Sequence, residues 1–187
     1  MAVMVEAIRT FTLARERAGD TRGPWGWWAD SRFTALVRAL ERTGAPLELA
    51  RFCASCILVL ATKETGWPVR EWNFNPWNLR GQFGGYSAVR PDAGVDHPFR
   101  AYPDIDASAG DVIRVLSAGA RYRHAWSDLV RGRSTMVEWY AAILEAGYGP
   151  PTQANIDEYS DLVGLVRQRY DAYLRGTIDV PGTHLEG

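Results

Sequence analysis

The chain has 187 residues, of which 47% are hydrophobic and 23% charged, and its formal net charge is −1. These values predict a soluble, globular chain of about one domain, long enough to bury its own core. Nucleic-acid-binding domains usually carry a basic surface, which a chain with this charge balance does not predict, so we expect no nucleic acid partner.

The cysteines and histidines argue against a metal centre. Cys53 and Cys56 are the only cysteines, they lie three positions apart in an apolar run, and no second cysteine or histidine pair stands near them. Buried free thiols are the simpler interpretation, and a redox pair is the alternative. The three histidines are scattered along the sequence. We therefore expect neither a bound metal nor a cofactor.

The sequence also predicts no membrane span and no Sec signal. Its longest unbroken apolar run, Cys56 to Ala61, is far shorter than the ~20 residues that a membrane helix needs. Near the N-terminus, Glu6 and Arg9 interrupt any apolar segment of the kind found in a secretion signal.

Residues 1–29 are expected to form an N-terminal arm. Apolar residues recur at helical spacing between Met4 and Phe11, and the stretch 19–28, which contains a Gly-Pro pair, interrupts them. Three tryptophans stand at positions 25, 27 and 28. They either cover the core of the domain or present a surface to a partner or a glycan.

The next two segments predict helices. Asp30 or Ser31 is a candidate N-cap for a helix that runs to Arg42. The following helix, from Leu47 to Thr65, is apolar on most sides, which indicates the central buried helix of the domain.

Residues 67–103 have a different character. Glycine, proline and asparagine are frequent there and no helical period is visible, which indicates a loop or small hairpin lobe. Residues 82–86 and 99–102 are the candidate strands. The predicted fold class is therefore mainly α, with one small β-hairpin lobe inserted into a helical domain at residues 30–175.

Helical signals return after this lobe. Capping-box patterns begin at Ser108, Thr135 and Asn155, and a further helix is expected from Tyr122 to Val130. The last helix carries an apolar stripe along one side. The tail, residues 176–187, has no period and is expected to be mobile.

Glu64 is the leading candidate for a catalytic group. It ends the apolar helix, just before Gly66, a residue type that commonly follows a helix C-cap. The negative end of the helix dipole and the nearby aromatic residues both disfavour a charged carboxylate, so we expect a raised pKa and a general acid. The alternative is an ordinary solvated or ion-paired glutamate.

The motifs around Glu64 resemble those of the bacterial N-acetylglucosaminidase family of peptidoglycan hydrolases. This family has a lysozyme-like fold and includes the flagellar wall-clearing enzyme, autolysins and phage tail lysins. The similarity covers roughly residues 31–170. Its motifs, in order, are Glu64-Thr65-Gly66-Trp67, Asn75-Pro76-Trp77-Asn78-Leu79-Arg80-Gly81, Phe99-Arg100-Ala101-Tyr102-Pro103, the helix Ala107 to Leu116, Arg121-Tyr122 and Ala146-Gly147-Tyr148.

The resemblance implies that Glu64 is the acid and that the ring of Tyr148 borders the cleavage site. The sequence departs from the family after Tyr148, because Gly149-Pro150-Pro151 stands where Ala-Thr-Asp-Pro is usual and the next tyrosine, Tyr159, lies further on. An altered linkage preference or a loss of activity would fit this departure.

Other residues are candidates for binding the sugar or activating water. Aromatic rings can stack on the apolar faces of pyranoses, and amides can bind N-acetyl and hydroxyl groups, although burial or turn formation explains the same residues. The second catalytic group is either a carboxylate or the acetamide of the substrate. The candidates are Trp67, Trp72, Asn75, Trp77, Asn78 and Tyr102 for binding, and Asp92 and Asp96 for the second carboxylate.

The sequence thus predicts a glycoside hydrolase that cleaves the β-1,4 bond after N-acetylglucosamine in peptidoglycan. A muramidase or lytic transglycosylase of the same fold is one alternative. A non-catalytic wall-binding or structural part of a phage tail or injection machine is another. Because no Sec signal is expected, we predict delivery to the cell wall, in the periplasm or outside the cell, with such an assembly, attached through residues 1–29.

Overall fold

The computed structural model describes residues 23–65, 73–85, 87–88 and 98–174. This part of the chain is mainly helical and contains one pair of very short strands. In chain order the elements are α2 (Gly23–Glu41), α3 (Leu47–Thr65), β1 (Ser87–Ala88), β2 (Phe99–Arg100), α4 (Ile105–Ala118), α5 (Arg123–Val130), α6 (Met136–Glu145) and α7 (Gln153–Leu174). Among these described helices, none combines the length and the apolar character that a membrane span requires.

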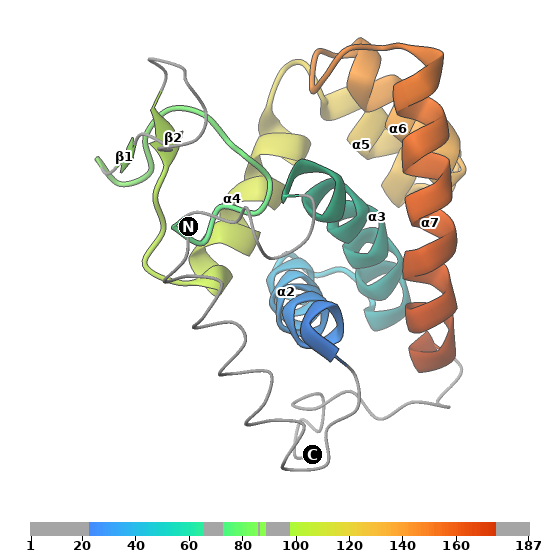
Figure 1. The fold of residues 1–187 in the computed structure, drawn as a ribbon, viewed down its shortest axis with the longest axis horizontal. Helices are drawn as coiled ribbons and strands as arrows, with labels where there is room; N and C mark the ends of the chain where they lie inside the picture. The colour runs from blue at the N-terminus through green and yellow to red at the C-terminus, as the bar shows by residue number, and fades with distance from the viewer. Residues whose placement is uncertain (1–22, 66–72, 86, 89–97, 175–187) are drawn as a thin grey trace.

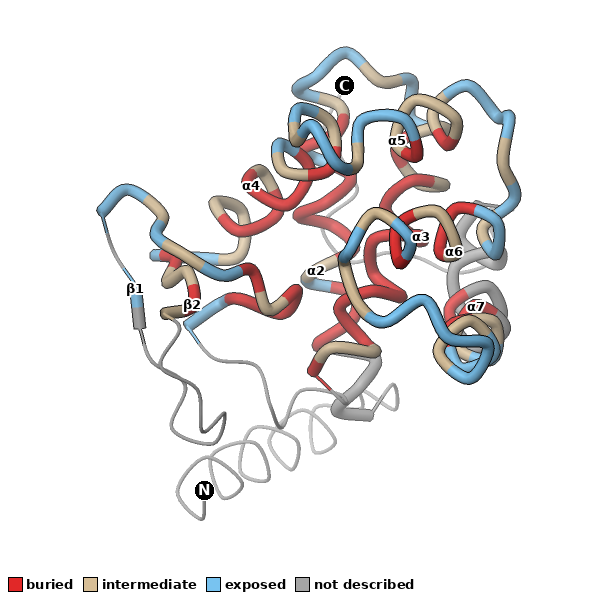
Figure 2. Tube along the Cα trace, turned by 90° about the horizontal axis from the view of Figure 1, so that it is seen from above, coloured by how far each residue is buried: buried red, intermediate tan, exposed pale blue. Residues whose placement is uncertain are grey.

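Helix α3 lies at the centre of the molecule, as its sequence predicts. Twelve of its nineteen residues are buried, and they point in every direction around the helix axis. Helix α2 packs along one side of α3 and helix α7 along another, while α4 packs against α2 (Figure 1). The burial map shows the same arrangement, with buried positions concentrated on α3 and on the parts of its neighbours that approach it (Figure 2). The hydrophobic effect of enclosing this helix therefore organises the fold.

Helix α2 begins earlier than predicted. It starts at Gly23, so Asp30 and Ser31 lie within the helix, and neither is its N-cap. A proline in the first helical turn is well tolerated, because its missing N–H would have no partner inside the helix, so Pro24 is compatible with an early start. Trp28 is buried. At this residue the core interpretation of the tryptophans is correct, and the predicted arm boundary at residue 29 falls inside α2.

The capping predictions had mixed outcomes. The box formed by Thr135 and Glu138 at the start of α6 is present, with both reciprocal hydrogen bonds. For α4 the N-cap is Asp104, whose side chain accepts from the Ala107 N–H, and the predicted Ser108 cap is wrong. For α7 the predicted Asn155 cap is also wrong, since the helix starts at Gln153 and the Thr152 hydroxyl accepts from the Asn155 N–H at 3.3 Å.

The inserted lobe contains an antiparallel pair of two-residue strands. Ser87 pairs with Arg100 and Ala88 with Phe99. Phe99–Arg100 falls within the predicted second strand, but the first strand lies after the predicted residues 82–86 rather than in them. The segment around residues 79–81 closes the base of the lobe, because the Leu79 carbonyl accepts from the Arg100 N–H and the Gly81 N–H donates to the Pro98 carbonyl.

Gly110 of helix α4 and Gly119, its C-cap residue, provide a test of the helix and its end. A Cβ at Gly110 would meet no atom within 4 Å, whereas one at Gly119 would approach the Val115 carbonyl oxygen to 2.4 Å. We expect Gly110→Ala to increase the free energy of unfolding by about 0.5–1 kcal/mol, because alanine has the better helix propensity. Gly119→Ala should decrease it by about 1–3 kcal/mol through the clash. Urea denaturation of both variants checks this, and equal effects would contradict the described end of α4.

Candidate functional site

Glu64 lies in the last turn of α3 and is partly exposed. Glu64 follows the buried part of the helix, so it lies at the edge of the core, where the chain leaves α3. The side chain of Asn78 reaches back from the following loop and donates from Nδ2 to the Glu64 backbone oxygen at 3.0 Å and to its Oε2 at 3.2 Å. One amide therefore satisfies a carbonyl at the helix end and also orients the carboxylate.

The loop that carries Asn78 is fixed by contacts with the core. The Trp77 indole N–H donates to the Ile57 carbonyl of α3 at 3.1 Å. The Asn75 amide donates to the Leu79 carbonyl at 2.9 Å and the Arg100 carbonyl at 3.1 Å, and its oxygen accepts from the Leu79 N–H at 3.0 Å. These bonds replace the regular hydrogen bonding that a loop lacks. They give Asn78 a defined position beside Glu64.

Tyr148 is brought to the same region by the end of α6. The Gly147 N–H donates to the Leu144 carbonyl and the Tyr148 N–H to the Ile143 carbonyl, which is the Schellman pattern, and Gly147 has a φ of 88°. The reversed chain direction places the Tyr148 hydroxyl 3.1 Å from the Trp77 carbonyl oxygen, to which it donates. Tyr148 thus bonds to the residue that precedes Asn78.

Two tyrosine side chains respond to the charge of Glu64. Burial, and then the Glu64 carboxylate, raise the pKa of Tyr148 well above its ordinary value. The same two causes, with Glu158 as a weaker third, raise the pKa of Tyr159. Both phenols therefore remain protonated at every physiological pH. An amide and two neutral phenols are therefore among the groups that lie around Glu64.

The cation next to Glu64 in sequence is engaged elsewhere. Lys63 forms an ion pair with Glu158 of α7, and its Nζ lies 5.8 Å from the centre of the Tyr159 ring. Tyr159 stacks on Tyr140 with ring centres 5.0 Å apart. These contacts join the end of α3, next to Glu64, to helix α7.

Three of the predicted sugar-binding residues are instead structural. Asn75, Trp77 and Tyr102 are buried. The Asn75 amide and the Trp77 indole N–H form the hydrogen bonds given above, and the Tyr102 hydroxyl donates to Asp111. None of them offers a ring face or an amide to a sugar, so their assignment to substrate binding is corrected. Asn78 alone of the described binding candidates contacts Glu64. The candidates Trp67, Trp72, Asp92 and Asp96 lie outside the described residues.

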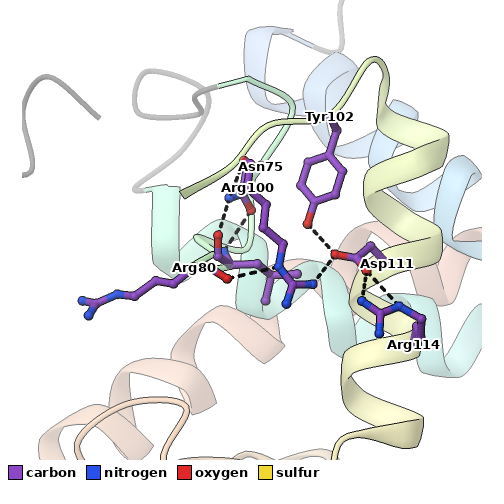
Figure 3. Close-up of polar contacts among 7 residues, drawn as sticks. Asn75, Arg80, Arg100, Tyr102, Asp111 and Arg114 are labelled. Carbon is purple, nitrogen blue, oxygen red and sulfur yellow. Dashed lines mark hydrogen bonds and ion pairs between the residues drawn. The ribbon is translucent and has the colours of Figure 1, made fainter. Parts of the chain in front are cut away.

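A charged cluster that the sequence did not indicate ties the lobe to helix α4. The Asp111 side chain, fully buried, accepts from the Tyr102 hydroxyl at 2.7 Å, from Arg100, and from the Arg114 Nε at 3.0 Å (Figure 3). Burial alone would raise the pKa of Asp111, but the bonds from Tyr102, Arg100 and Arg114 outweigh it and hold the pKa below the ordinary 3.8. In the sequence, Asp111 looked like half of a capping box.

The described residues provide no metal site, because no three His, Cys, Asp or Glu side chains among them are grouped to hold an ion. Cys53 and Cys56 are buried free thiols, as the simpler interpretation predicted. Burial raises the pKa of Cys53 to about 12 and that of Cys56 well above its ordinary value. Buried thiols of this kind are typically inert, which favours a structural role over a redox pair.

No protein-family model matches this chain, and no curated protein or solved structure matches it either. The resemblance over residues 31–170 therefore stays a prediction. The function of the site has to be inferred from its own geometry.

The Asp111 cluster predicts a pH-dependent stability. Asp111→Asn should lower the free energy of unfolding at pH 7 by about 2–3 kcal/mol, because the buried network loses the negative charge and one of its two acceptor oxygens. The pKa of Asp111 is lower in the folded chain than in the unfolded chain, so its contribution is present above pH 3.8 and is lost as the pH falls through the folded value.

Chemical denaturation of the parent and of Asp111→Asn between pH 2 and pH 7, roughly the range over which an aspartate titrates, measures this. The free energies of unfolding of the parent and of Asp111→Asn should converge at the lowest pH. Asp104→Asn, on the same helix, is the control, because asparagine caps a helix as well as aspartate does. A gap between parent and Asp111→Asn that stays constant down to the lowest pH would contradict the assigned ionisation.

Proposed function

We propose that this chain is an endo-acting N-acetylglucosaminidase that cleaves the β-1,4 bond after N-acetylglucosamine in peptidoglycan. Glu64 is the proton donor to the leaving oxygen. The observation that carries the proposal is the position of this carboxylate. It is partly exposed in the last turn of the central buried helix, oriented by Asn78 and bordered by two protonated tyrosines.

A carboxylate in this position suits general acid catalysis. The carbonyl end of α3 places the negative pole of the helix dipole at Glu64, and the carboxylate is partly buried beside two phenols that stay neutral. Both effects favour the protonated form, which is the form that an acid catalyst needs at the start of the reaction. Asn78, bonded to Oε2, keeps the carboxyl group in one orientation.

Tyr148 is proposed to support the sugar rather than to exchange protons. Its hydroxyl hydrogen is directed to the Trp77 carbonyl, and its raised pKa keeps that proton in place. The T-shaped contact with Tyr122, at 6.1 Å between ring centres, fixes the ring plane. The ring can therefore border the cleavage site as the resemblance implies.

The finer fold proposed is lysozyme-like. In support, the buried helix that carries the candidate acid is followed by a lobe with a short strand pair. Further helices follow the lobe in the chain, and α7 packs against the buried helix. The second catalytic group is proposed to be Asp92 or Asp96, or else the acetamide of the substrate itself. No cofactor takes part in either route.

Delivery to the wall by a phage tail or injection assembly is part of the same proposal. Because α2 begins at Gly23 and Trp28 belongs to the core, attachment through the arm is now restricted to residues 1–22.

Glu64→Gln should abolish wall clearing and leave the fold intact. The amide keeps the size and the hydrogen bond to Asn78 but has no proton to give, and loss of an acid catalyst typically lowers the rate ~10²- to 10⁴-fold. The control is Glu48→Gln, the same substitution at the opposite end of the same helix, where Glu48 is exposed and pairs with Arg51. Clearing of purified wall and the melting temperature are measured for both variants.

The parent and Glu48→Gln should clear the wall at similar rates, and all three proteins should melt within a few degrees. Clearing by Glu64→Gln within a few-fold of the parent would rule out Glu64 as the acid.

A non-catalytic wall-binding component is the second candidate function. The departure from the family pattern after Tyr148, where Gly149-Pro150-Pro151 stands, favours it, because an altered cleavage site fits a loss of activity. A folded parent protein that binds purified wall but produces no clearing would support this candidate and contradict the hydrolase.

A further inference from the structure

Phe74 is one of the few large hydrophobic side chains exposed in the described part of the chain. Its exposed fraction is 45%, and the others are Leu47 and Val137. Leu47 is the first residue of α3 and Val137 lies in the first turn of α6, both on helix surfaces. Phe74 lies in the loop after α3, four residues before Asn78, whose amide contacts Glu64.

The backbone of Phe74 adopts an unfavourable conformation. Its φ is 53°, in the left-handed region, where a Cβ approaches the following carbonyl oxygen. Asn73 and Asn78 share this conformation, with φ values of 50° and 51°, but asparagine tolerates it and a bulky aromatic residue does not. Residues held in this way persist only where surrounding contacts impose the conformation, and they are concentrated at functional sites.

The contacts that impose the conformation lie on both sides of Phe74. The Asn73 carbonyl accepts from the Tyr102 N–H at 3.1 Å, and Asn75 is buried with three hydrogen bonds. These hydrogen bonds anchor the chain on both sides of Phe74. The folded protein therefore keeps a half-exposed phenyl ring at the loop that orients Glu64, against both its backbone preference and the hydrophobic effect.

We propose that Phe74 is a substrate platform, on which a pyranose ring of a β-1,4-linked N-acetylhexosamine strand stacks when the strand binds across Glu64. This inference rests on the proposed function. A pyranose has an apolar C–H face that matches an exposed aromatic ring, and its polar edge remains free for amides. Asn73, exposed beside Phe74, provides such an amide. The platform replaces the contacts expected from Trp77 and Tyr102.

Binding of a soluble β-1,4-linked N-acetylglucosamine oligomer tests the platform. The oligomer is titrated by calorimetry into the chain that carries Glu64→Gln, so that it is not cleaved, with and without further changes at position 74. Phe74→Ala and Phe74→Gly should weaken binding about tenfold, and Phe74→Trp should retain it. Leu47→Ala, which removes an equally exposed apolar side chain from the other end of α3, should have no effect on binding.

Melting temperatures separate this role from a structural one. Glycine adopts a φ of 53° without penalty, so Phe74→Gly should melt no lower than Phe74→Ala while losing the same affinity. A ring needed for packing would instead give two variants that both melt lower than the parent and that bind with unchanged affinity.

The outcomes distinguish the platform from the proposed function. If the Glu64→Gln chain binds the oligomer and Phe74→Ala binds it equally well, the platform is wrong and the hydrolase proposal stands. If the unmodified chain neither clears wall nor binds the oligomer, the proposed function fails and the platform fails with it.

Discussion

The structure depends on the burial of helix α3 over most of its length. From Cys53 to Thr62 every residue is buried, so this part of the helix has no face exposed to solvent, and α2 and α7 pack directly against the helix. Even its backbone accepts extra bonds, from the Trp77 indole at the Ile57 carbonyl and from the Tyr140 hydroxyl at the Cys56 carbonyl, 2.9 Å away. A helix held this firmly can position the residue at its end, and that residue is Glu64.

The loop after α3 provides the side chains that fix and orient Glu64. Its side chains return to the helix that precedes it: Trp77 anchors the loop in the core, and Asn78 reaches the Glu64 carboxylate. Asp111 performs the corresponding task on the far side of the lobe, where it joins Arg100 and Tyr102 to α4. Asn75, Arg100 and Tyr102 therefore stabilise the shape of the lobe, and Asn73 and Phe74 are among its exposed residues.

The sequence predicted best where one physical signal dominates. The bounds of α3 follow from its continuous apolar character, and the Thr135–Glu138 box correctly starts α6. The same box pattern failed at Ser108 and Asn155, since a serine or asparagine three residues before an acidic residue is equally compatible with a helix interior. The start of α2 was missed because Gly23-Pro24 resembles a break.

The roles of Asn75, Trp77 and Tyr102 were not predictable, because the same aromatic and amide groups serve a sugar or a core. What decides between them is burial, which depends on distant contacts such as that between Tyr102 and Asp111. Composition and spacing contain no such information. The position of Glu64 at the end of an apolar helix, by contrast, was predictable because it is a local property, while its role as the acid stays a prediction.

Mass spectrometry of the products released from purified peptidoglycan tests the central claim most directly. An N-acetylglucosaminidase that uses Glu64 as the acid should release fragments with a new reducing-end N-acetylglucosamine. Fragments that end in anhydro-muramic acid, or in reducing-end muramic acid, would show that a different bond is cleaved and would contradict the account.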